Sequence, residues 1–484
     1  MSEIRVETDT MGEVRVPAGA HYGAQTQRAV ENFPISGIRF PRAFLRALGL
    51  VKAAAAEVNR ELGLLNPRYA DAILRAAREV AEGRWDDQFP LDIFQTGSGT
   101  STNMNANEVI SSRANELLGG GLGDRKPVRP NDEVNKSQSS NDVIPTAIHL
   151  ATLNGLHHDL LPALETLAGA LEAKAEEFRD VLKTGRTHLQ DAVPMTLGQE
   201  FSGYASQARH GLARVRTALK HLEEVPIGGT ALGTGLNAPP DFGARMCAVL
   251  QREMGFAVRE AENKFEAMGS RDALVEASGA LKTVAVSLLK IASDIRLLSC
   301  GPRTGIAEIA IPELQPGSSI MPGKVNPVMP EMMIQVGAQV IGNDAAVTVG
   351  GLFGQLDLNV MMPVMAHNIL QSITILAAAA RTFTERCVAA GPPMPGNADN
   401  ARGIVANRER CRALVENSLM PVTALAPRIG YKEAAAVAQE AHRTGKTVRE
   451  VVLERGLAPA GELDQLLDLT AMTHPGIREG AGGG

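Results

Sequence analysis

The feature that most constrains the fold is an apolar seam between residues 274 and 298. Apolar residues recur there at alternating steps of three and four positions, the a/d spacing of a helix packed in a bundle. The seam consists of Leu274, Ala277, Leu281, Val284, Leu288, Ile291, Ile295 and Leu298. A similar stripe consists of Leu153, Leu156, Leu160, Leu164, Leu167 and Leu171. The sequence therefore predicts a mainly α protein built on a long-helix bundle.

Composition narrows the class of protein further. Hydrophobic residues make up 44% of the 484, enough for a sizeable core, and only 4% are aromatic. Alanine and leucine dominate the long segments, which favours helices that pack closely through small residues. The net charge of −6 is scattered, and no basic stripe with interleaved aromatics occurs. We therefore expect no nucleic-acid partner.

The character of the sequence changes twice along the chain. Residues 1–140 mix short helical patterns with polar, glycine-rich loops, whereas residues 141–393 are dominated by long helical periodicity. The proline-rich stretch "GPPMPGN" at 391–397 breaks that pattern, and shorter helices follow in residues 394–484. We predict an N-terminal domain, a central bundle domain and a small C-terminal helical domain with these bounds.

One uncharged window, residues 358–380, is long enough to cross a membrane. It carries two Asn, a His, a Gln, a Ser, a Thr and an internal Pro, so we interpret it as a buried central helix and expect no membrane association. The charged N-terminal residues lack the apolar core of a signal peptide. The four cysteines are far apart and predict neither disulfides nor an iron–sulfur cluster. A cytoplasmic protein is expected.

The stretch "QPGSSIMPGKVNP", residues 315–327, cannot be the middle of a helix or of a central strand, because proline lacks the N–H donor. Three other polar clusters resemble it in composition. They are "QTGSGTSTNMNANE" at 95–108, "RPNDEVNKSQSSNDVIPT" at 129–146 and "GRTHLQDAVPMTLGQE" at 185–200. Taken singly, each is explained by helix capping or a turn. Each also stands beside an end of a long predicted helix, where a bundle protein can gather loops into one site.

Several chemistries are excluded by spacing. The glycine–lysine pair in "GSSIMPGKV" is one residue too far from Gly317 for a phosphate-binding loop, and Val325 stands where a Ser or Thr should be. No G-x-G-x-x-G follows a predicted strand. The "HHD" at 157–159 places its side chains on different sides of a helix, and no H-E-x-x-H occurs. We expect no metal and no cofactor.

The pooled clusters contain hydroxyls, amides, one His, one Lys and Glu331, which suits a small anionic substrate. Lys324 and Asn326 can bind carboxylate oxygens, and backbone N–H groups around Gly317 can add donors. Such donors are needed when a proton leaves a carbon beside a carboxylate, because charge moves onto those oxygens in the transition state. His188 is then the acid or base for the group that leaves the neighbouring carbon.

These residues carry a family resemblance. "GSSIMPGKVNP" resembles the signature loop of the fumarase/aspartase superfamily, and similarity extends from "DTMGEVRVP" through "GAQTQRAVENFPISG" to "IGYKEAAAVAQ". The chain is most similar to class II fumarases. The resemblance implies the fumarase/aspartase fold, with the central helices packing into the core of a homotetramer. It also implies reversible hydration of fumarate to (S)-malate, by anti elimination through a carbanion-like intermediate.

The resemblance also implies roles at matching positions. Ser318 would be the base that takes the C3 proton of malate, and His188, paired with Glu331, would handle the leaving water. The substrate carboxylates would be held by Ser98, Gly99, Thr100, Ser139, Ser140, Asn141, Thr187, Ser319, Lys324, Val325 and Asn326. Three subunits contribute to each site in this family, so Ser139 and His188 are expected from different chains.

A second, peripheral anion site is known in this family around "HPND". Here the histidine is replaced by Arg129, followed by Pro130, Asn131 and Asp132. The arginine could bind a dicarboxylate more firmly, or the site could have another geometry. The resemblance leaves both open.

Two other functions stay open. Aspartase, which releases ammonia, has Gln in place of His188, a "QST" in place of the "QSS" at 138–140, and no counterpart of Ser98, so these three positions favour fumarase. Against them, the segments 354–364 and 445–456 look more like aspartase. A non-catalytic scaffold of the same fold is the second alternative, and loss of the Ser, His or Lys that would favour it is not seen.

Overall fold

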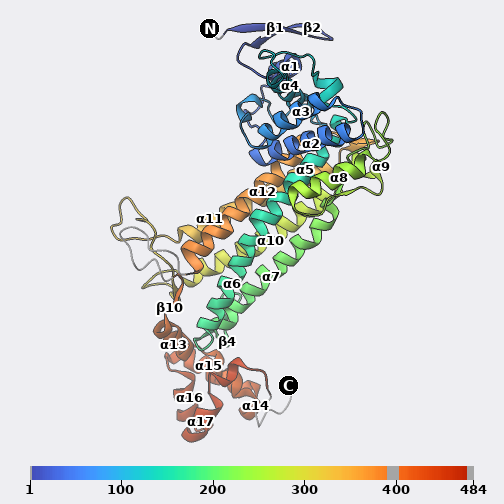
Figure 1. Cartoon of the computed structure of the whole chain (residues 1–484). Helices are drawn as coiled ribbons and strands as arrows, with labels where there is room; N and C mark the ends of the chain where they lie inside the picture. Colours follow the sequence, from blue (N-terminus) through green and yellow to red (C-terminus); the bar gives the residue numbers. More distant parts are fainter. Residues whose placement is uncertain (1–2, 390–402, 477–484) are drawn as a thin grey trace. The chain divides into compact units, whose positions relative to one another are not determined.

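The fold is mainly α-helical in this computed structural model, which describes residues 3–389 and 403–476 (Figure 1). Within these residues the strands form two-stranded pairs and no larger sheet. The pairs are β1 (Ile4–Asp9) with β2 (Gly12–Pro17), β3 (Leu182–Thr187) with β4 (Gln190–Thr196), β5 (Glu224–Val225) with β6 (Arg259–Glu260), β7 (Ile309–Ala310) with β10 (Val405–Ala406), and β8 (Gly354–Gln355) with β9 (Leu358–Asn359). The predicted fold class is confirmed.

The N-terminal helices pack through small residues, as the composition predicts. They are α1 (Ala24–Asn32), α2 (Arg42–Glu61), α3 (Pro67–Ala81) and α4 (Thr100–Leu117). Gly49 on α2 shows how close α2 and α3 approach. A Cβ atom placed there would lie 2.7 Å from the backbone nitrogen of Ala81 and 2.9 Å from the carbonyl oxygen of Ala77. Only glycine at this position lets the two backbones approach so closely.

The long helices follow. They are α5 (Ser140–Gly155), α6 (Leu161–Glu177), α7 (Leu197–Leu222), α10 (Asp272–Leu298), α11 (Val328–Gly351) and α12 (Met362–Phe383), with the shorter α8 (Phe242–Met254) and α9 (Lys264–Gly269) between α7 and α10. The wider turn η3 (Leu156–Leu160) continues α5 into α6. All six leucines of the stripe between Leu153 and Leu171 are at most 1% exposed. The seam residues on α10 are at most 5% exposed, so both predicted stripes are confirmed as core-facing.

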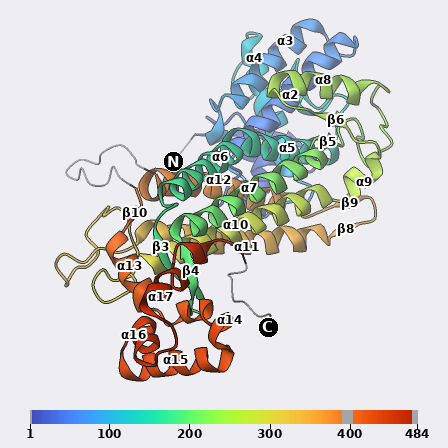
Figure 2. The same ribbon diagram turned by 90° about the horizontal axis from the view of Figure 1, so that it is seen from below.

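The described chain divides into two compact units. The first contains the described residues up to 162 with residues 211–286 and 336–377, and the second contains residues 163–210, 287–335 and the described residues from 378 onward. Within each unit, segments of α7, α10, α11 and α12 run alongside one another (Figures 1 and 2). In the first unit the Ser278 hydroxyl of α10 donates to Asp344 of α11 at 2.8 Å. The predicted division at 140/141 and 393/394 stays a prediction, and its second boundary and the 391–397 break lie outside the described residues.

α12 and the turn η4 (Thr384–Val388) that follows it form the one stretch, within the described residues, long and apolar enough to span a membrane. In its most apolar window 61% of the residues are buried inside the protein. Asn343 of α11 donates to Gln371 and Ser372 of α12, each at 3.0 Å. Such burial and polar contact are typical of a core helix, in agreement with the interpretation from sequence.

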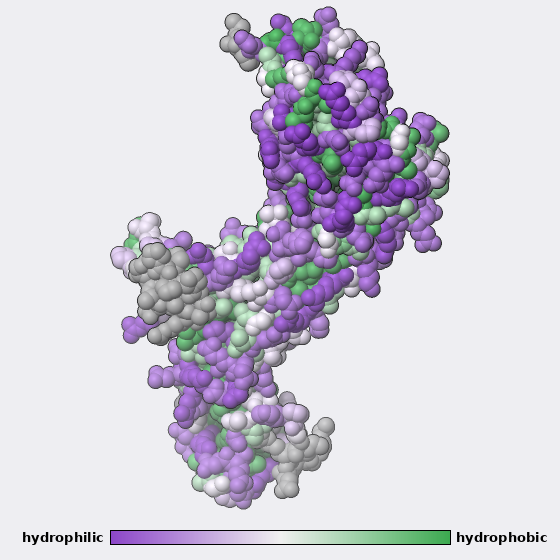
Figure 3. All heavy atoms as spheres, viewed as in Figure 1, coloured by the Kyte–Doolittle hydropathy of each residue, from purple (hydrophilic) through white to green (hydrophobic). Residues whose placement is uncertain are grey.

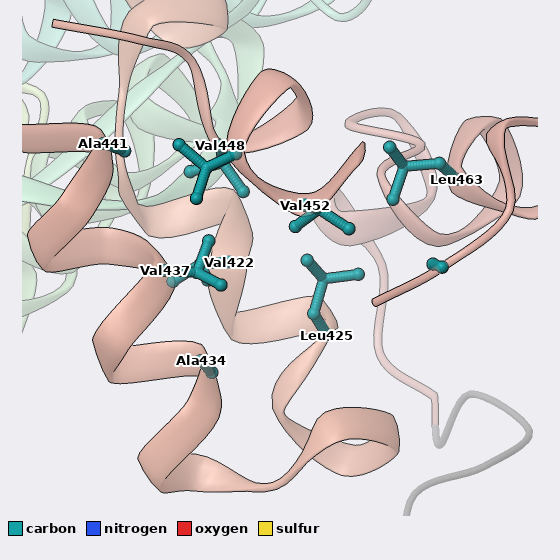
Figure 4. Close-up of a cluster of buried hydrophobic side chains, with 10 residues drawn as sticks. Val422, Leu425, Ala434, Val437, Ala441, Val448, Val452 and Leu463 are labelled. Carbon is teal, nitrogen blue, oxygen red and sulfur yellow. The ribbon is translucent and has the colours of Figure 1, made fainter. Parts of the chain in front are cut away.

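The C-terminal residues of the second unit form short helices around their own small core. The helices are α13 (Arg408–Asn417), α14 (Ala426–Ile429), α15 (Tyr431–Thr444), α16 (Val448–Glu454) and α17 (Ala460–Leu466). The buried cluster consists of Val422, Leu425, Ala434, Val437, Ala441, Val448, Val451, Val452, Ala458 and Leu463 (Figure 4). Short helices of this kind depend on such packing, because they are marginal alone.

Apolar side chains also reach the surface of the long helices. Val286 and Leu297 of α10 are 51% and 39% exposed, and Ile341 and Val349 of α11 are 39% and 49% exposed. On the face shown in Figure 3, hydrophobic residues lie among hydrophilic ones along the central helices. An apolar helix face that water reaches in one chain is available for contact with another protein surface.

Candidate active site

Each of the four polar clusters leads into the N-terminal end of a helix. α4 begins at Thr100, α5 at Ser140 and α11 at Val328, and α7 begins at Leu197 directly after the β3–β4 hairpin. A helix N-terminus offers unpaired N–H groups and the positive end of the helix dipole, which together stabilise an anion. The clusters therefore stand at four positions suited to carboxylate binding.

Three hydroxyls of the predicted site are joined in a chain in the first unit. Ser98 Oγ lies 2.7 Å from Thr100 Oγ1, which lies 2.8 Å from Ser140 Oγ. Between them Gly99 has a φ of 71°, and a Cβ atom there would lie 2.9 Å from the side chain of Ile144. Glycine is thus required for α4 to start so close to α5. The structure brings these sequence-predicted residues together.

The first turn of α5 is held by its own side chains. Ser139 is the N-cap residue, and its hydroxyl accepts a hydrogen bond from the Asn141 backbone N–H at 3.2 Å. The Asp142 carboxylate accepts in return from the Ser139 N–H at 2.9 Å, which completes a capping box. The Asn141 amide donates to the Ala231 carbonyl oxygen at 2.7 Å. The capping interpretation of this cluster is confirmed, and the Ser140 hydroxyl and the Asn141 amide oxygen take no part in the cap.

Behind this turn lies a buried lysine that sequence reasoning missed. Lys52 of α2 is 0% exposed, and its Nζ donates to Asn135 and to Gln138, each at 3.0 Å. Burial lowers the pKa of Lys52 to about 7 and raises the pKa of Asp142, which is also fully buried, to about 6. A charge removed from water needs several hydrogen bonds to be tolerated, so the two amides that bind Lys52 and the backbone N–H groups that bind Asp142 are needed to offset this burial. These hydrogen bonds fix the segment that leads into Ser139.

His188 stands at the tip of the β3–β4 hairpin in the second unit. Thr187 pairs with Gln190, so His188 and Leu189 are the two central residues of the turn. Their φ values are 57° and 60°, the left-handed region that hairpin turns of this length require. That region costs a residue with a Cβ roughly 1–2 kcal/mol. Both side chains are exposed, and Leu189 is 71% exposed.

Two-residue turns of this conformation favour Asn-Gly, whereas this turn contains His-Leu. The resulting backbone strain is of the kind that concentrates at functional sites. The hairpin itself was not predicted, because the sequence pattern identified only the helix that follows. The strain is consistent with the catalytic role expected of His188.

Buried charges anchor this hairpin. Arg186, two residues before His188, donates to both carboxylate oxygens of Glu308 at 3.1 and 3.0 Å. The Lys183 ammonium lies 3.3 Å from the same carboxylate and 2.6 Å from Glu200. The Glu308 side chain is 0% exposed, and that of Lys183 is 1% exposed. These residues were also missed by sequence reasoning, because Glu308 lies more than 120 positions from Lys183 and Arg186 and nothing in the sequence pattern links them.

The 315–327 loop precedes α11, and several of its polar groups form hydrogen bonds with other residues of the same loop. The Ser318 hydroxyl oxygen accepts from the backbone N–H groups of Ile320 at 3.2 Å and Met321 at 2.9 Å. Two donors aimed at one hydroxyl oxygen stabilise negative charge on it, so they favour the alkoxide. A serine hydroxyl is ordinarily a weak base, and these two donors make its alkoxide more accessible.

The rest of the loop follows the same pattern. Lys324 Nζ donates to the Asn326 amide oxygen at 2.8 Å, and the Asn326 amide nitrogen donates to the Gly317 carbonyl oxygen at 2.6 Å. Gly317 N–H donates to the Lys324 carbonyl oxygen at 2.7 Å, which closes the loop. Ser319, Lys324 and Val325 are exposed, and Asn326 is half-buried. The two carboxylate-binding candidates thus satisfy each other in the absence of a ligand.

Glu331 lies in the first turn of α11 and is half-buried. The predicted site residues before position 142 belong to the first unit, and those from Thr187 to Glu331 belong to the second. Each group of site residues is therefore considered within its own unit. The predicted pairing of His188 with Glu331 stays a prediction.

Arg129 is already paired within its own segment. Its guanidinium lies 3.0 Å from Asp132 and 3.0 Å from Glu133, and its backbone N–H donates to Glu133 at 2.7 Å. The hydrogen bond to Glu133 raises the pKa of Arg129. Pro130 and Asn131 follow in the turn η2 (Pro130–Val134). Two neighbouring carboxylates compete with any bound anion, so this arrangement favours the second alternative, a site of different geometry.

The cavities in the described part of the chain include four of about 330–460 Å³, each lined by residues of a single unit. None of these four is lined by a predicted site residue. The one in the first unit, of about 390 Å³, lies beside His149, His221 and Arg271, and the other three lie in the second unit. Within the described residues, no group of three or more His, Cys, Asp and Glu is arranged to hold a metal ion.

Comparison with known proteins places these residues in a family. A family model described as a lyase matches residues 12–342, and one described as the fumarase C C-terminus matches residues 422–474. "Fumarate hydratase class II" of Mycobacterium tuberculosis is 57% identical over 473 residues, 97% of this chain and 96% of the relative. "Fumarate hydratase, mitochondrial" of Rattus norvegicus is 51% identical over 476 residues, 98% of this chain and 91% of the relative.

Solved structures agree. The class II fumarase from Schistosoma mansoni has a TM-score of 0.92 at 39% identity, covering 97% of this chain and 99% of that one. A fumarate lyase:delta crystallin structure from Brucella melitensis, bound to cobalt, has a TM-score of 0.90 at 46% identity, covering 98% and 100%. The extent and identity of these matches show that the chain is a lyase and belongs to the class II fumarate hydratase family.

Proposed function

We propose that this chain catalyses the reversible hydration of fumarate to (S)-malate. The observation that carries the proposal is the pair of backbone N–H groups at the Ser318 hydroxyl oxygen, in a chain 57% identical to a class II fumarate hydratase. A serine so placed can act as a base toward a weak carbon acid, because its alkoxide is stabilised before substrate arrives.

In the malate-to-fumarate direction, the Ser318 alkoxide takes the C3 proton. The electron pair left on C3 delocalises into the adjacent carboxylate, which becomes a dianion. Lys324 and Asn326, released from each other, would donate to its oxygens, and one well-placed donor of this kind is worth ~3 kcal/mol in the transition state. The hydroxyl chain of Ser98, Thr100 and Ser140 would hold the other carboxylate.

The second step expels the C2 hydroxyl. His188, oriented by Glu331, would donate a proton to that hydroxyl so that it leaves as water while the C2–C3 double bond forms. In the hydration direction the same imidazole accepts a proton from the attacking water. General acid–base catalysis of this kind contributes typically 10²–10⁴-fold. No step in this scheme requires a metal or a cofactor.

The assembly and location are also proposals. The exposed apolar residues of α10 and α11 support packing of the central helices into a homotetramer, in which three subunits would contribute to each site. We propose a cytoplasmic location, and note that the Rattus norvegicus relative is named as mitochondrial. The substrate class, a small dicarboxylate, follows from the family.

The main alternative function is that of an aspartase, and specific residues distinguish it from a fumarase. His188 and Ser98 favour loss of water over loss of ammonia, whereas the segments at 354–364 and 445–456 resemble aspartase. The leaving group is handled at the site, so we give the site residues more weight than distant helices. The scaffold alternative would require loss of Ser318, His188 or Lys324, and all three are present.

The test offers the purified chain (S)-malate and aspartate in separate assays, with fumarate absorbance as the readout. Each assay is repeated with a chelator. Fumarate from malate alone supports the proposal, whereas fumarate from aspartate alone identifies an aspartase. No fumarate from either substrate would indicate a scaffold, and rapid loss of activity with the chelator would contradict the metal-free mechanism.

A further inference from the structure

A glycine-rich turn that no predicted site residue belongs to is bonded directly to the first turn of α5. The Asp142 carboxylate accepts from the backbone N–H groups of Gly228 at 3.0 Å and Thr230 at 2.9 Å. The Ala231 carbonyl oxygen, one residue further, accepts from the side-chain amide of Asn141 at 2.7 Å. Residues 228–231, hereafter the 228–231 turn, therefore contact two adjacent residues in the first turn of α5, Asn141 and Asp142.

Thr230 is the unusual residue in this turn. Its φ is 53°, in the left-handed region, where a β-branched residue is a genuine outlier. The same loop uses glycine at 228, 233 and 235, where φ values of 88°, 122° and 71° also demand it. Thr230 is 5% exposed, and its hydroxyl is buried with no hydrogen-bond partner in the described part of the chain. Strain of this kind persists only where the surrounding structure imposes it.

The contact with Ala231 sets the orientation of Asn141. A carbonyl oxygen can only accept, so the amide nitrogen of Asn141 must face Ala231 and its amide oxygen must face away. One amide N–H is used by Ala231, which leaves the oxygen and the second N–H for a ligand. If the turn moved, the amide could rotate and present the wrong atoms.

We propose that the 228–231 turn is a positioning element for the substrate-binding end of α5, and that Thr230 is its key positioning residue. The buried threonine side chain anchors the turn, the Thr230 N–H is held by Asp142, and the Ala231 carbonyl oxygen fixes the Asn141 amide. The proposal rests on the proposed function, because it assigns these contacts to the dicarboxylate site.

The decisive variant is Thr230→Gly. Glycine adopts the left-handed conformation without strain, so a turn with a purely structural role should keep or gain stability. We expect instead that the folded variant has a KM for malate and for fumarate at least fivefold higher, with kcat changed less than twofold. This split follows because Asn141 would bind substrate and transition state alike.

Three comparisons make the test specific. Thr230→Ser, which keeps a buried hydroxyl, should restore a KM near that of the wild type. Asn237→Gly replaces an exposed residue of the same loop whose φ is 66°, and should leave KM unchanged. In an Asn141→Ala background, Thr230→Gly should add little, because residues that act through one contact are not additive.

The outcomes separate the two proposals. If the wild-type chain forms no fumarate from malate, the proposed function fails. If the wild type is active and Thr230→Gly keeps a wild-type KM, or raises it equally in the Asn141→Ala background, the positioning role is wrong. If Thr230→Gly does not fold, KM is measured in Thr230→Ser and Thr230→Val instead. A raised KM in Thr230→Val alone supports a positioning role for the hydroxyl, and a wild-type KM in both variants contradicts it.

Discussion

The α5 segment, residues 138–142, and the 315–327 loop are both proposed to bind a substrate carboxylate, and they are held in place in opposite ways. The α5 segment is bonded to two other parts of the first unit: Gln138 accepts from Lys52 of α2, and both Asn141 and Asp142 are bonded to the 228–231 turn. In the loop the side chains of Ser318, Lys324 and Asn326 are bonded to groups of the loop itself. The α5 segment is thus held by residues outside it, whereas the 315–327 loop is held by hydrogen bonds among its own residues.

The difference indicates which region must rearrange. The α5 segment can present hydroxyls and an amide without moving, so little ordering entropy is lost on binding. Lys324 and Asn326 must first give up their mutual hydrogen bond before either can bind a carboxylate. A mostly exposed loop with few outside contacts is also the kind of segment that opens at low cost. We infer that the α5 segment supplies preorganised binding and that the loop supplies groups brought in with the substrate.

The largest effect is expected at the loop serine. Ser318→Ala removes the base, so kcat should fall about a thousandfold, in the middle of the range for general acid–base catalysis. Because the loop has few outside contacts, the thermal midpoint should change by less than about 2 °C. Steady-state kinetics and thermal unfolding measure both, and Ser319→Ala is the matched control, expected to alter KM more than kcat. A Ser318→Ala enzyme with near-full kcat would refute the assigned role.

Acid should weaken the α5 region. Burial, with a smaller effect from the Arg271 charge, lowers the pKa of His149 on α5 to about 4, from 6.5. Between these values the unfolded state binds the proton and the folded state does not. The stability contribution is thus complete above pH 6.5 and is lost as the pH falls toward 4, a cost on the order of 3 kcal/mol.

Urea unfolding at pH 7.5 and pH 4.5 measures this loss. His149→Gln should flatten the pH dependence over this interval, and His442→Gln, at an exposed histidine of α15, should leave it unchanged. An equal slope in all three proteins would show that another group is responsible.

His188→Asn separates catalysis from backbone strain. The imidazole is lost, so kcat should fall about a hundredfold. Asparagine tolerates the left-handed conformation better than histidine, so unfolding stability should be equal or slightly higher. Kinetics and denaturant unfolding on the same preparation test both. A variant that loses stability without losing kcat would assign His188 a structural role.

The smallest effect is expected at Lys324, because its ammonium group would be one of several donors to the substrate carboxylates. Lys324→Met should raise KM for malate about tenfold, which corresponds to ~1.4 kcal/mol, near the lower limit for a hydrogen bond to a charged group. The control is Lys432→Met, at an exposed lysine of α15, which should have no effect on KM. If KM is unchanged in Lys324→Met, the loop does not bring this charge to the substrate.

A candidate site could be proposed from the sequence, since its residue types are rare in combination, and the roles of its residues stay predictions. Four polar clusters beside helix ends, and the resemblance of the loop at 315–327, identified Ser318, His188 and the hydroxyls. The buried supports were missed. Lys52 interrupts the alanine-rich apolar stretch of α2, and this was the available signal for a lysine that is 0% exposed. Thr230 gave no signal, since a positive φ at a threonine cannot be read from residue type.

The sequence by itself determined the helical seam of α10 and the leucine stripe of α5 and α6, because apolar spacing of three and four residues has one packed solution. It also indicated that each polar cluster lies beside an end of a helix. Only the tertiary structure decided that His188 stands at the tip of a strained hairpin, that Glu308 pairs with Arg186, and that Asp142 joins α5 to the 228–231 turn. These contacts join residues tens of positions apart, and no local pattern encodes which buried charge will meet which partner.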